Sequence, residues 1–185
     1  MKMYQLVEWF QVNYPQRHHD LLQCNHNFDE TNLNPYHLES DCWSHTMMVC
    51  KIAEISNYDK VVQIAALLHD IGKPAVRNIN PRNNHVQFFG HEALSAEMAE
   101  EPLEQLIREG LLIEEEKKEV LQLIIHHAFL YKYSEAQEIL TYFHGDKAFC
   151  RHLIQLVRSD SFGRFSADPM DERKYQNLLN YFGDI

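Results

Sequence analysis

Twelve histidines are the feature of this 185-residue sequence that bears most directly on chemistry. Helical spacing decides which of them point inward, because residues three, four and seven positions apart share one helix face. Three histidines share a face with apolar residues: His45 with Met48, Val49 and Ile52, His69 with Val62, Ala65 and Ala66, and His127 with Val120, Leu123 and Ile124. A single inward histidine is usually a hydrogen-bonded core residue. Several together, on different helices, favour a metal-binding cluster.

Asp160 strengthens the prediction of a metal site. It lies on the same helical stripe as Leu153, Leu156 and Val157, which places a carboxylate on an apolar face. Taking that charge out of water costs several kcal/mol unless the group is paired or coordinates a metal. The nearest cation in the sequence, Arg158, points about 160° away around the helix. A metal ion is therefore the partner that we expect for Asp160.

The adjacent pair His69 and Asp70 indicates where such an ion would lie. Neighbouring side chains differ by about 100° around a helix, so both can reach one ion only if it lies between their two directions, off the helix end. Gly72 ends this helix and leaves Lys73 near its C-terminus, where the ammonium either binds a phosphate oxygen or is simply solvated. Imidazole and carboxylate ligands without thiolate suit Mn, Fe, Co, Ni or Zn, and a partly open octahedral site would also accept Mg. Such an ion lowers the pKa of a bound water toward 7 and so supplies a hydroxide nucleophile.

Helical periodicity dominates the rest of the chain, with no convincing run of period-two alternation. The fold class that this predicts is all-α, a bundle of about seven or eight helices forming one domain over residues 1–185. We expect helices at residues 2–13, 41–56, 58–71, 91–109, 114–130, 134–143, 146–162 and 170–182. The Asn- and Pro-rich stretches 24–40 and 74–90 are the least regular, and each precedes a motif histidine, so both are candidate substrate loops.

Composition limits the class of partner. The net charge of −10, with acidic clusters at residues 97–104 and 114–119, favours a small nucleotide or an RNA end over a long duplex. The longest apolar runs, 64–68 and 121–125, are far shorter than the roughly 20 residues of a membrane span. Residues 1–10 lack the pattern of a signal peptide, so a cytoplasmic protein is the expectation. The oligomeric state has no signature in the sequence.

The four cysteines suggest no chemistry of their own. They show no CxxC pairing, and in a reducing compartment scattered thiols are most simply buried small apolar groups. A zinc knuckle built from Cys24, His26, His37 and Cys42 remains an alternative, although its spacing matches no standard zinc site. The sequence has no GxxxxGK loop, HExxH helix or GxSxG elbow, which argues against P-loop, zincin and serine-hydrolase chemistry.

The spacing of His45, His69-Asp70 and Asp160 resembles the signature of the HD superfamily of metal-dependent phosphohydrolases. The likeness extends through HDIGKP at 69–74, FFGHE at 88–92, His127 and RSDSFGR at 158–164, and so covers roughly residues 35–165. The segment NPYHLESDCWSHT, residues 34–46, is similar to the stretch before the first metal histidine in HD domains attached to bacterial tRNA nucleotidyltransferases and poly(A) polymerases. The resemblance implies a hydrolase of the 2′,3′-cyclic phosphodiesterase and phosphatase type that acts on nucleotides or RNA ends.

The resemblance also implies roles for individual residues. His45, His69, Asp70 and Asp160 would bind one ion, while His91 and His127 would bind a second with Asp70 bridging; His126 is the second choice to His127. One-metal members of the superfamily exist, so one and two ions both stay open. We further expect Asp70 to orient the attacking water, Lys73 to bind a nonbridging phosphate oxygen and His37 to contact the leaving group. Arg164 would bind substrate or cap exposed helix carbonyls.

Two other functions remain as alternatives. Related HD folds also cleave deoxynucleotides or dinucleoside polyphosphates, so a nucleotide-pool hydrolase is possible. A non-catalytic HD module, in which a metal only ties helices together, belongs to a different class. The chain also departs from well-known patterns: no Gly-rich nucleotidyltransferase segment precedes the motifs, and Ala-Phe-Leu follows His127, which disfavours cyclic-di-GMP as a substrate.

Overall fold

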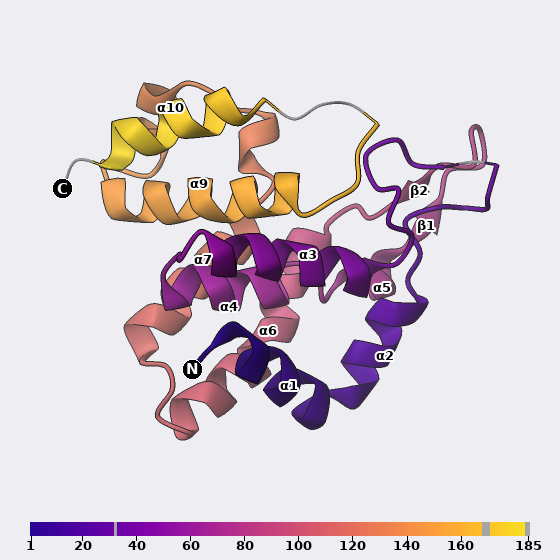
Figure 1. Cartoon of the computed structure of the whole chain (residues 1–185), viewed down its shortest axis with the longest axis horizontal. Coiled ribbons are helices and arrows are strands. Elements are labelled where there is room, and N and C mark those ends of the chain that lie inside the picture. Colours follow the sequence, from indigo (N-terminus) through magenta and orange to yellow (C-terminus); the bar gives the residue numbers. More distant parts are fainter. Residues whose placement is uncertain (32, 168–170, 184–185) are drawn as a thin grey trace.

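The computed structural model describes residues 1–31, 33–167 and 171–183 (Figure 1). The helices are α1 (Met3–Asn13), α2 (Pro15–Gln23), α3 (Cys42–Ile55), α4 (Lys60–Leu68), α5 (Lys73–Val76), α6 (His91–Arg108), α7 (Glu114–His126), α8 (Ala136–Tyr142), α9 (Lys147–Phe162) and α10 (Glu172–Gly183), with a 3-10 turn at Phe129–Tyr131. Within the described residues the β structure is limited to a two-stranded antiparallel sheet of β1 (Asn78–Ile79) and β2 (Val86–Gln87). The prediction of an all-α fold is confirmed.

Helix α4 forms the centre of the fold. Every residue from Ile64 to Leu68 is buried, because this part of the helix is apolar on all sides and so must be enclosed by other helices. It packs against α3, α7 and α9, and α6 covers α7. Figure 1 shows α9 and α10 together at one end of the molecule and α1 and α2 at the other, with α3 and α4 between them.

Aspartate caps fix the starts of the two helices that bear the outermost motif residues. The carboxylate of Asp41 accepts a hydrogen bond from the Ser44 backbone N–H at 2.8 Å and so begins α3, which places His45 in its first turn. The carboxylate of Asp146 accepts from the Phe149 N–H at 2.9 Å and begins α9, which carries Asp160 in its last turn. No helix of the described chain combines the length and apolar character that crossing a membrane requires.

Several predicted boundaries were wrong. Helix α2 was missed, since no helix was predicted between residues 13 and 41; it begins at Pro15, and proline is favourable at the first position of a helix. The helix expected at 58–71 ends at Leu68, so His69 and Asp70 lie in the turn after it. The helix expected at 114–130 ends at His126, and β1 and β2 lie in the stretch interpreted as an irregular loop. Residue 170, the expected start of the last helix, lies outside the described residues, and α10 begins at Glu172.

Gly163, which follows α9, lies against the backbone of α3. A Cβ atom there would lie 2.6 Å from the backbone N of Val49 and 2.7 Å from the backbone O of Ser159. Because backbone atoms cannot move aside as a flexible side chain can, Gly163→Ala should lower the free energy of unfolding by about 1–3 kcal/mol or more. Urea unfolding measures this. Gly183→Ala, whose Cβ would meet nothing within 4 Å, is the matched control, and equal stability of the two variants would contradict the prediction.

Candidate metal centre

Five segments bring the six expected ligand side chains together: α3, the turn after α4, the first residue of α6, the end of α7, and α9. In the first half of the cluster, His45 Nε2 lies 3.0 Å from Asp160 Oδ1 and 3.6 Å from Asp70 Oδ2. His69 Nε2 lies 3.2 Å from Asp70 Oδ2. The His45 and His69 side chains are fully buried. One ligand atom each from His45, His69 and Asp70 lie within 4.8 Å of one another, close enough to share an ion.

The second half of the cluster uses the other oxygen of the same carboxylate. His91 Nε2 lies 3.3 Å from Asp70 Oδ1 and 3.1 Å from His127 Nε2. Asp70, His91 and His127 also offer ligand atoms within 4.8 Å of one another. Asp70 therefore presents Oδ2 to one group and Oδ1 to the other, the arrangement of a carboxylate that could bridge two ions.

Backbone carbonyls orient three of the imidazoles. The Nδ1 atoms of His69, His91 and His127 lie 2.9, 2.8 and 2.7 Å from the carbonyl oxygens of Ala66, Phe88 and Ile124. A carbonyl oxygen only accepts hydrogen bonds, so Nδ1 carries the proton and donates it. Each Nε2 lone pair is then directed to the cluster, as in metal sites where a partner on the outer ring nitrogen fixes the tautomer.

Several polar atoms of the cluster have no hydrogen bond. His45 Nε2, His69 Nε2 and Asp70 Oδ1 are buried and unpartnered among the described residues. Buried polar atoms are rarely left unsatisfied, because each one costs the free energy of its lost hydration. Divalent cations would satisfy these atoms, one beside the two imidazole nitrogens and one beside Asp70 Oδ1, so the residues present fit the metal that the sequence predicted.

Electrostatics keeps Asp70 ionised and His127 neutral, as ligands need. For His45, in contrast, the nearby carboxylates of Asp160 and Glu39 outweigh burial and raise its pKa to about 9, so binding a metal would release its proton. Burial by itself would raise the pKa of Asp70, but the neighbouring His69 and Lys73 hold it well below its usual range. Lys73 Nζ lies 2.6 Å from Asp70 Oδ2, and this carboxylate outweighs burial in raising the pKa of Lys73. Burial lowers the pKa of His127 to about 4, so its imidazole is neutral. A carboxylate, an ammonium and a neutral imidazole therefore lie side by side.

A cleft gives access to this cluster. It has a volume of about 360 Å³, and its lining includes Asp70, Lys73, His91, His127 and Asp160. Lys73 Nζ lies 5.2 Å from the centre of the Phe88 ring, which forms one wall. His37 also lines the cleft, as expected for a residue that contacts substrate. The stretches 24–40 and 74–90 thus both contribute to the rim.

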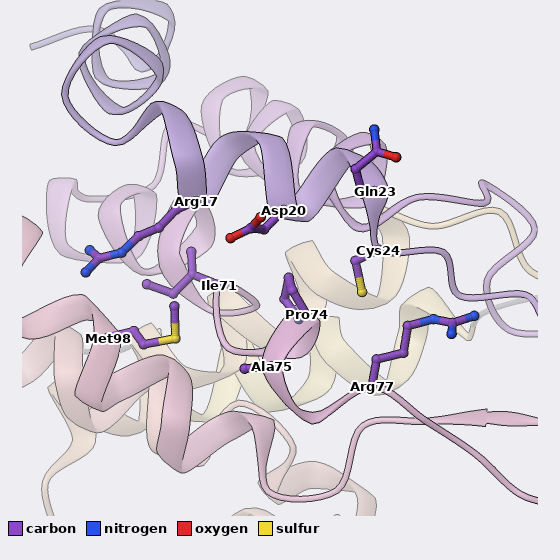
Figure 2. A pocket seen from close by; sticks show the side chains of 9 residues that line it. All are labelled: Arg17, Asp20, Gln23, Cys24, Ile71, Pro74, Ala75, Arg77 and Met98. Atoms are coloured by element: carbon purple, nitrogen blue, oxygen red, sulfur yellow. The ribbon is translucent and has the colours of Figure 1, made fainter.

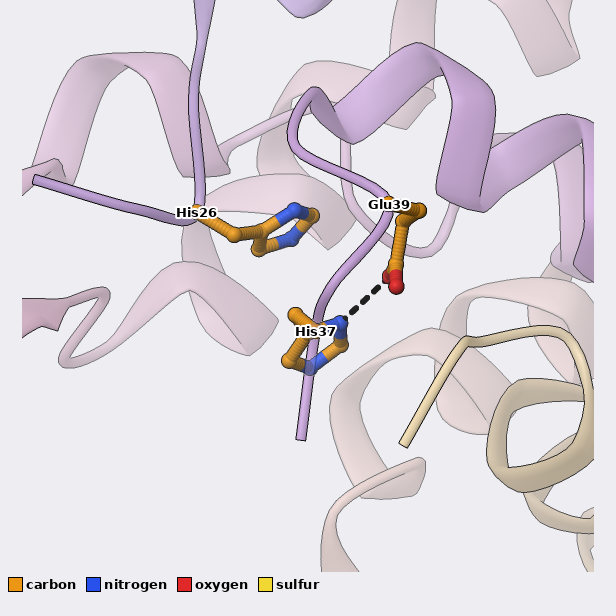
Figure 3. Close-up of side chains that lie close together, drawn as sticks. All are labelled: His26, His37 and Glu39. Atoms are coloured by element: carbon orange, nitrogen blue, oxygen red, sulfur yellow. Dashed lines mark hydrogen bonds and ion pairs between the residues drawn. The ribbon is translucent and has the colours of Figure 1, made fainter. Parts of the chain in front are cut away.

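Glu39 is a residue of this site that the sequence analysis missed. Its side chain is 1% exposed, and Oε1 lies 2.7 Å from His37 Nδ1 (Figure 3). The same oxygen lies 3.2 Å from His45 Nδ1. The Glu39 carboxylate thus contacts His45, a candidate metal ligand, and His37, a candidate substrate contact. Glu39 lies in a loop where no periodicity reports burial, so the sequence held no signal for it.

His26 was considered only for the zinc knuckle, and it completes a third group with His37 and Glu39. The two imidazoles are stacked, with ring centres 4.3 Å apart and planes 8° apart, so their in-plane lone pairs do not converge on one ion. His26 Nε2 lies 3.3 Å from Lys73 Nζ, which donates to it. The stacked geometry does not suit an ion, and the group instead orients Lys73 and His37. The zinc knuckle gains no support, since the convergent groups of the described chain contain no thiol.

Arg164 and His126 lie at the edge of the site or outside it. Arg164 Nε donates to the Ser161 carbonyl oxygen at 3.3 Å, a capping contact at the end of α9. Its charge also helps to lower the pKa of Asp160, after the larger effects of burial, which raises that pKa, and of His45 and His69, which lower it. The ring of His126 packs 5.1 Å from that of Phe143 and belongs to none of the three groups.

A second cavity, also of about 360 Å³, borders the motif segment on another side. Figure 2 shows that its side chains come from α2, from the segment Ile71–Arg77 and from Met98 of α6. Its two arginines are already engaged, Arg17 with Glu101 at 2.6 Å and Arg77 with the Asn25 carbonyl oxygen at 2.8 Å. None of the six candidate ligands lines it, so the metal chemistry belongs to the other cleft.

A helical core that directs histidines and aspartates from separate helices onto one buried point is the architecture of the HD domain. The family model described as "HD domain" matches residues 42–160, which is more than half of the sequence, and the chain belongs to this family. HD domains are typically found in metal-dependent hydrolases.

Two curated relatives share a printed name, "Multifunctional CCA protein". The chain is 32% identical over 150 residues to the one from Burkholderia orbicola, which covers 75% of this chain and 34% of that protein. It is 38% identical over 72 residues to the one from Paraburkholderia phymatum, which covers 38% of this chain and 16% of that protein. The chain therefore spans about a third or less of these relatives.

Proposed function

We propose that this chain is a metal-dependent phosphohydrolase of nucleotide or RNA-end phosphoesters, of the 2′,3′-cyclic phosphodiesterase and phosphatase type. The observation that carries the proposal is the placement of Asp70, whose two oxygens face two groups of histidines and which lines an open cleft together with His91 and His127. The relatives' printed name and the likeness of residues 34–46 to HD domains of tRNA nucleotidyltransferases support the nucleotide or RNA-end class. In this proposal residues 1–185 act as one HD domain.

The proposed ligands are His45, His69, Asp70 and Asp160 for one divalent ion, with His91, His127 and Asp70 for a second. When bound, such ions supply Lewis acidity and an activated water for attack on phosphorus. Ions of Mn, Fe, Co, Ni, Zn and Mg all suit imidazole and carboxylate donors. Asp70 also orients the water, because its carboxylate lies between the two groups beneath the cleft.

Two further side chains act on the substrate in this proposal. Lys73 lines the cleft while Asp70 and His26 hold its ammonium, so a remaining N–H can donate to a nonbridging phosphate oxygen. His37 donates its Nδ1 proton to Glu39, a carboxylate that only accepts. Its Nε2 is thereby left as an acceptor for a hydroxyl of the leaving group.

Product analysis tests this function. The purified protein is incubated with Mn, Ni or Mg and offered 2′,3′-cyclic AMP, 2′-AMP, deoxynucleoside triphosphates and diadenosine tetraphosphate, and products are separated by chromatography. We expect metal-dependent ring opening or release of a single phosphate. Cleavage confined to the triphosphates or the dinucleotide would assign the chain to the nucleotide-pool hydrolases, and no turnover with any metal would indicate a non-catalytic module.

The contact of Glu39 with His45 leads to a prediction of its own. Glu39→Gln keeps the size of the side chain but removes the charge that faces His45 Nδ1 and His37 Nδ1. Partners on the outer nitrogen of a ligand histidine typically contribute 10–100-fold to metal affinity, so the variant should bind Mn²⁺ about 10–100-fold more weakly. Calorimetric titration with Mn²⁺ measures the dissociation constant.

Glu30→Gln is the matched control for Glu39→Gln. Glu30 precedes Glu39 in the same loop and is exposed, so its variant should bind Mn²⁺ as the unmodified protein does. Identical Mn²⁺ affinities of the two variants would show that Glu39 does not support the metal site.

A further inference from the structure

A smaller cavity adjoins the cleft of the metal centre. It has a volume of about 240 Å³ and lies between residues 34–36 and the β1–β2 hairpin. Asn34, Val86 and Gln87 line both this cavity and the cleft, so the two spaces adjoin one another along these residues. A ligand whose phosphate lies at Lys73 could therefore extend into the smaller cavity.

Several polar side chains that line the smaller cavity have groups available for hydrogen bonds to a ligand. Across the described residues, the Tyr36 hydroxyl, the His85 ring and the Gln87 amide make no hydrogen bond or ion pair. The Asn34 amide oxygen accepts from the Tyr36 backbone N–H at 3.0 Å, which leaves its NH₂ group available. Val86 is buried and adds an apolar side chain to the lining of this cavity. Aromatic rings, free amides and an apolar side chain in one concave space are the make-up of a small-molecule site.

We propose that this cavity binds the base of a nucleoside phosphate whose phosphate group lies at Lys73 and Asp70. The inference rests on the proposed function and names the part of the substrate that the phosphate-handling groups do not contact. Tyr36 and His85 offer ring faces for stacking, which is how proteins hold unpaired bases. Gln87 offers a paired donor and acceptor that match the edge of a base, adenine above all, and the Asn34 NH₂ group offers a further donor.

The exposure of the aromatic side chains agrees with this placement. Tyr36 is 54% exposed and Phe89, on the rim of the neighbouring cleft, is 77% exposed. The bound base would cover part of the ring of Tyr36 and so recover apolar surface from water.

Binding measurements separate the base from the phosphate. Calorimetric titration of the Mn²⁺-loaded protein with AMP and with ribose 5-phosphate compares two ligands that differ only by the base. We expect AMP to bind at least about tenfold more tightly, and Tyr36→Ala to weaken AMP about tenfold or more, as loss of one stacking contact does, with ribose 5-phosphate unchanged. Tyr36→Phe should keep the AMP affinity, because it keeps the ring. Tyr4→Ala, which removes an exposed tyrosine of α1, is the matched control.

Two results would overturn the base cavity: equal affinity of the unmodified protein for both ligands, or equal weakening of both by Tyr36→Ala. A 3′-phosphorylated adenosine trinucleotide that binds more tightly than AMP would identify an RNA end as the source of the base, and equal binding would identify a mononucleotide. Hydrolysis of bis(p-nitrophenyl) phosphate, which has no base, reports on the proposed function alone. If the protein does not hydrolyse this ester but binds AMP more tightly than ribose 5-phosphate, the hydrolase proposal is refuted while the proposal of a base cavity is supported.

Discussion

Asp70→Asn should lower kcat/KM for 2′,3′-cyclic AMP by at least about a thousandfold, because a shared metal ligand supports several kcal/mol of transition-state stabilisation. Its two carboxylate oxygens face the two groups of histidines, so one substitution disturbs both. Asparagine has the same shape and retains one acceptor, so the fold should persist. Initial rates at saturating Mn²⁺ give the effect, and thermal unfolding shows whether the variant is folded.

Asp171→Asn is the matched control for Asp70→Asn. Its carboxylate is 60% exposed, just before α10, and touches no part of the cluster. We expect it to hydrolyse the cyclic nucleotide at the unmodified rate. Activity of Asp70→Asn within tenfold of this control would mean that the metal and the water are held elsewhere.

Lys73→Met should have two effects that can be measured separately. Without metal, it leaves the buried Asp70 carboxylate without the ammonium 2.6 Å away. Breaking a buried pair by removing one partner typically costs about 3–5 kcal/mol of stability, and urea unfolding in EDTA should show a loss of that order. With metal, turnover should fall about 10²–10³-fold, the usual effect of losing one preorganised donor to the transition-state charge.

The response of the two effects to Mn²⁺ distinguishes a lysine that contacts the substrate from a purely structural lysine. Mn²⁺ should restore much of the stability of Lys73→Met, because the cation replaces the ammonium beside Asp70, but it should not restore turnover. Full recovery of turnover with Mn²⁺ would assign Lys73 a structural role only. Lys118→Met, which removes an exposed lysine of α7, should change neither quantity.

The helical class and the motif residues were predictable because both follow from periodicity. An apolar stripe at helical spacing identifies a helix, and a histidine or aspartate on that stripe identifies a buried polar group, as for His45 and Asp160. The family match over residues 42–160 agrees with the resemblance that these residues carry. The structure brings the six expected ligands together, and their roles stay predictions.

What the sequence did not reveal depends on contacts between distant segments. Glu39 and His26 lie in a loop without periodicity, and their burial comes from packing against α3 and Lys73. The strands β1 and β2 have two residues each, which is too few to show the alternation of polar and apolar residues that identifies a strand. Helix α2 begins at Pro15, which signals a start or a stop depending on the backbone that precedes it.

Equilibrium dialysis against Mn²⁺ tests most directly whether the buried cluster is a metal centre. The unmodified protein, Asp70→Asn and Asp171→Asn are dialysed side by side, and the bound metal per chain is measured by atomic absorption. We predict one or two ions per chain in the unmodified protein and in Asp171→Asn, and none retained by Asp70→Asn. Equal metal contents in all three proteins, or none in any of them, would contradict a metal centre built on Asp70.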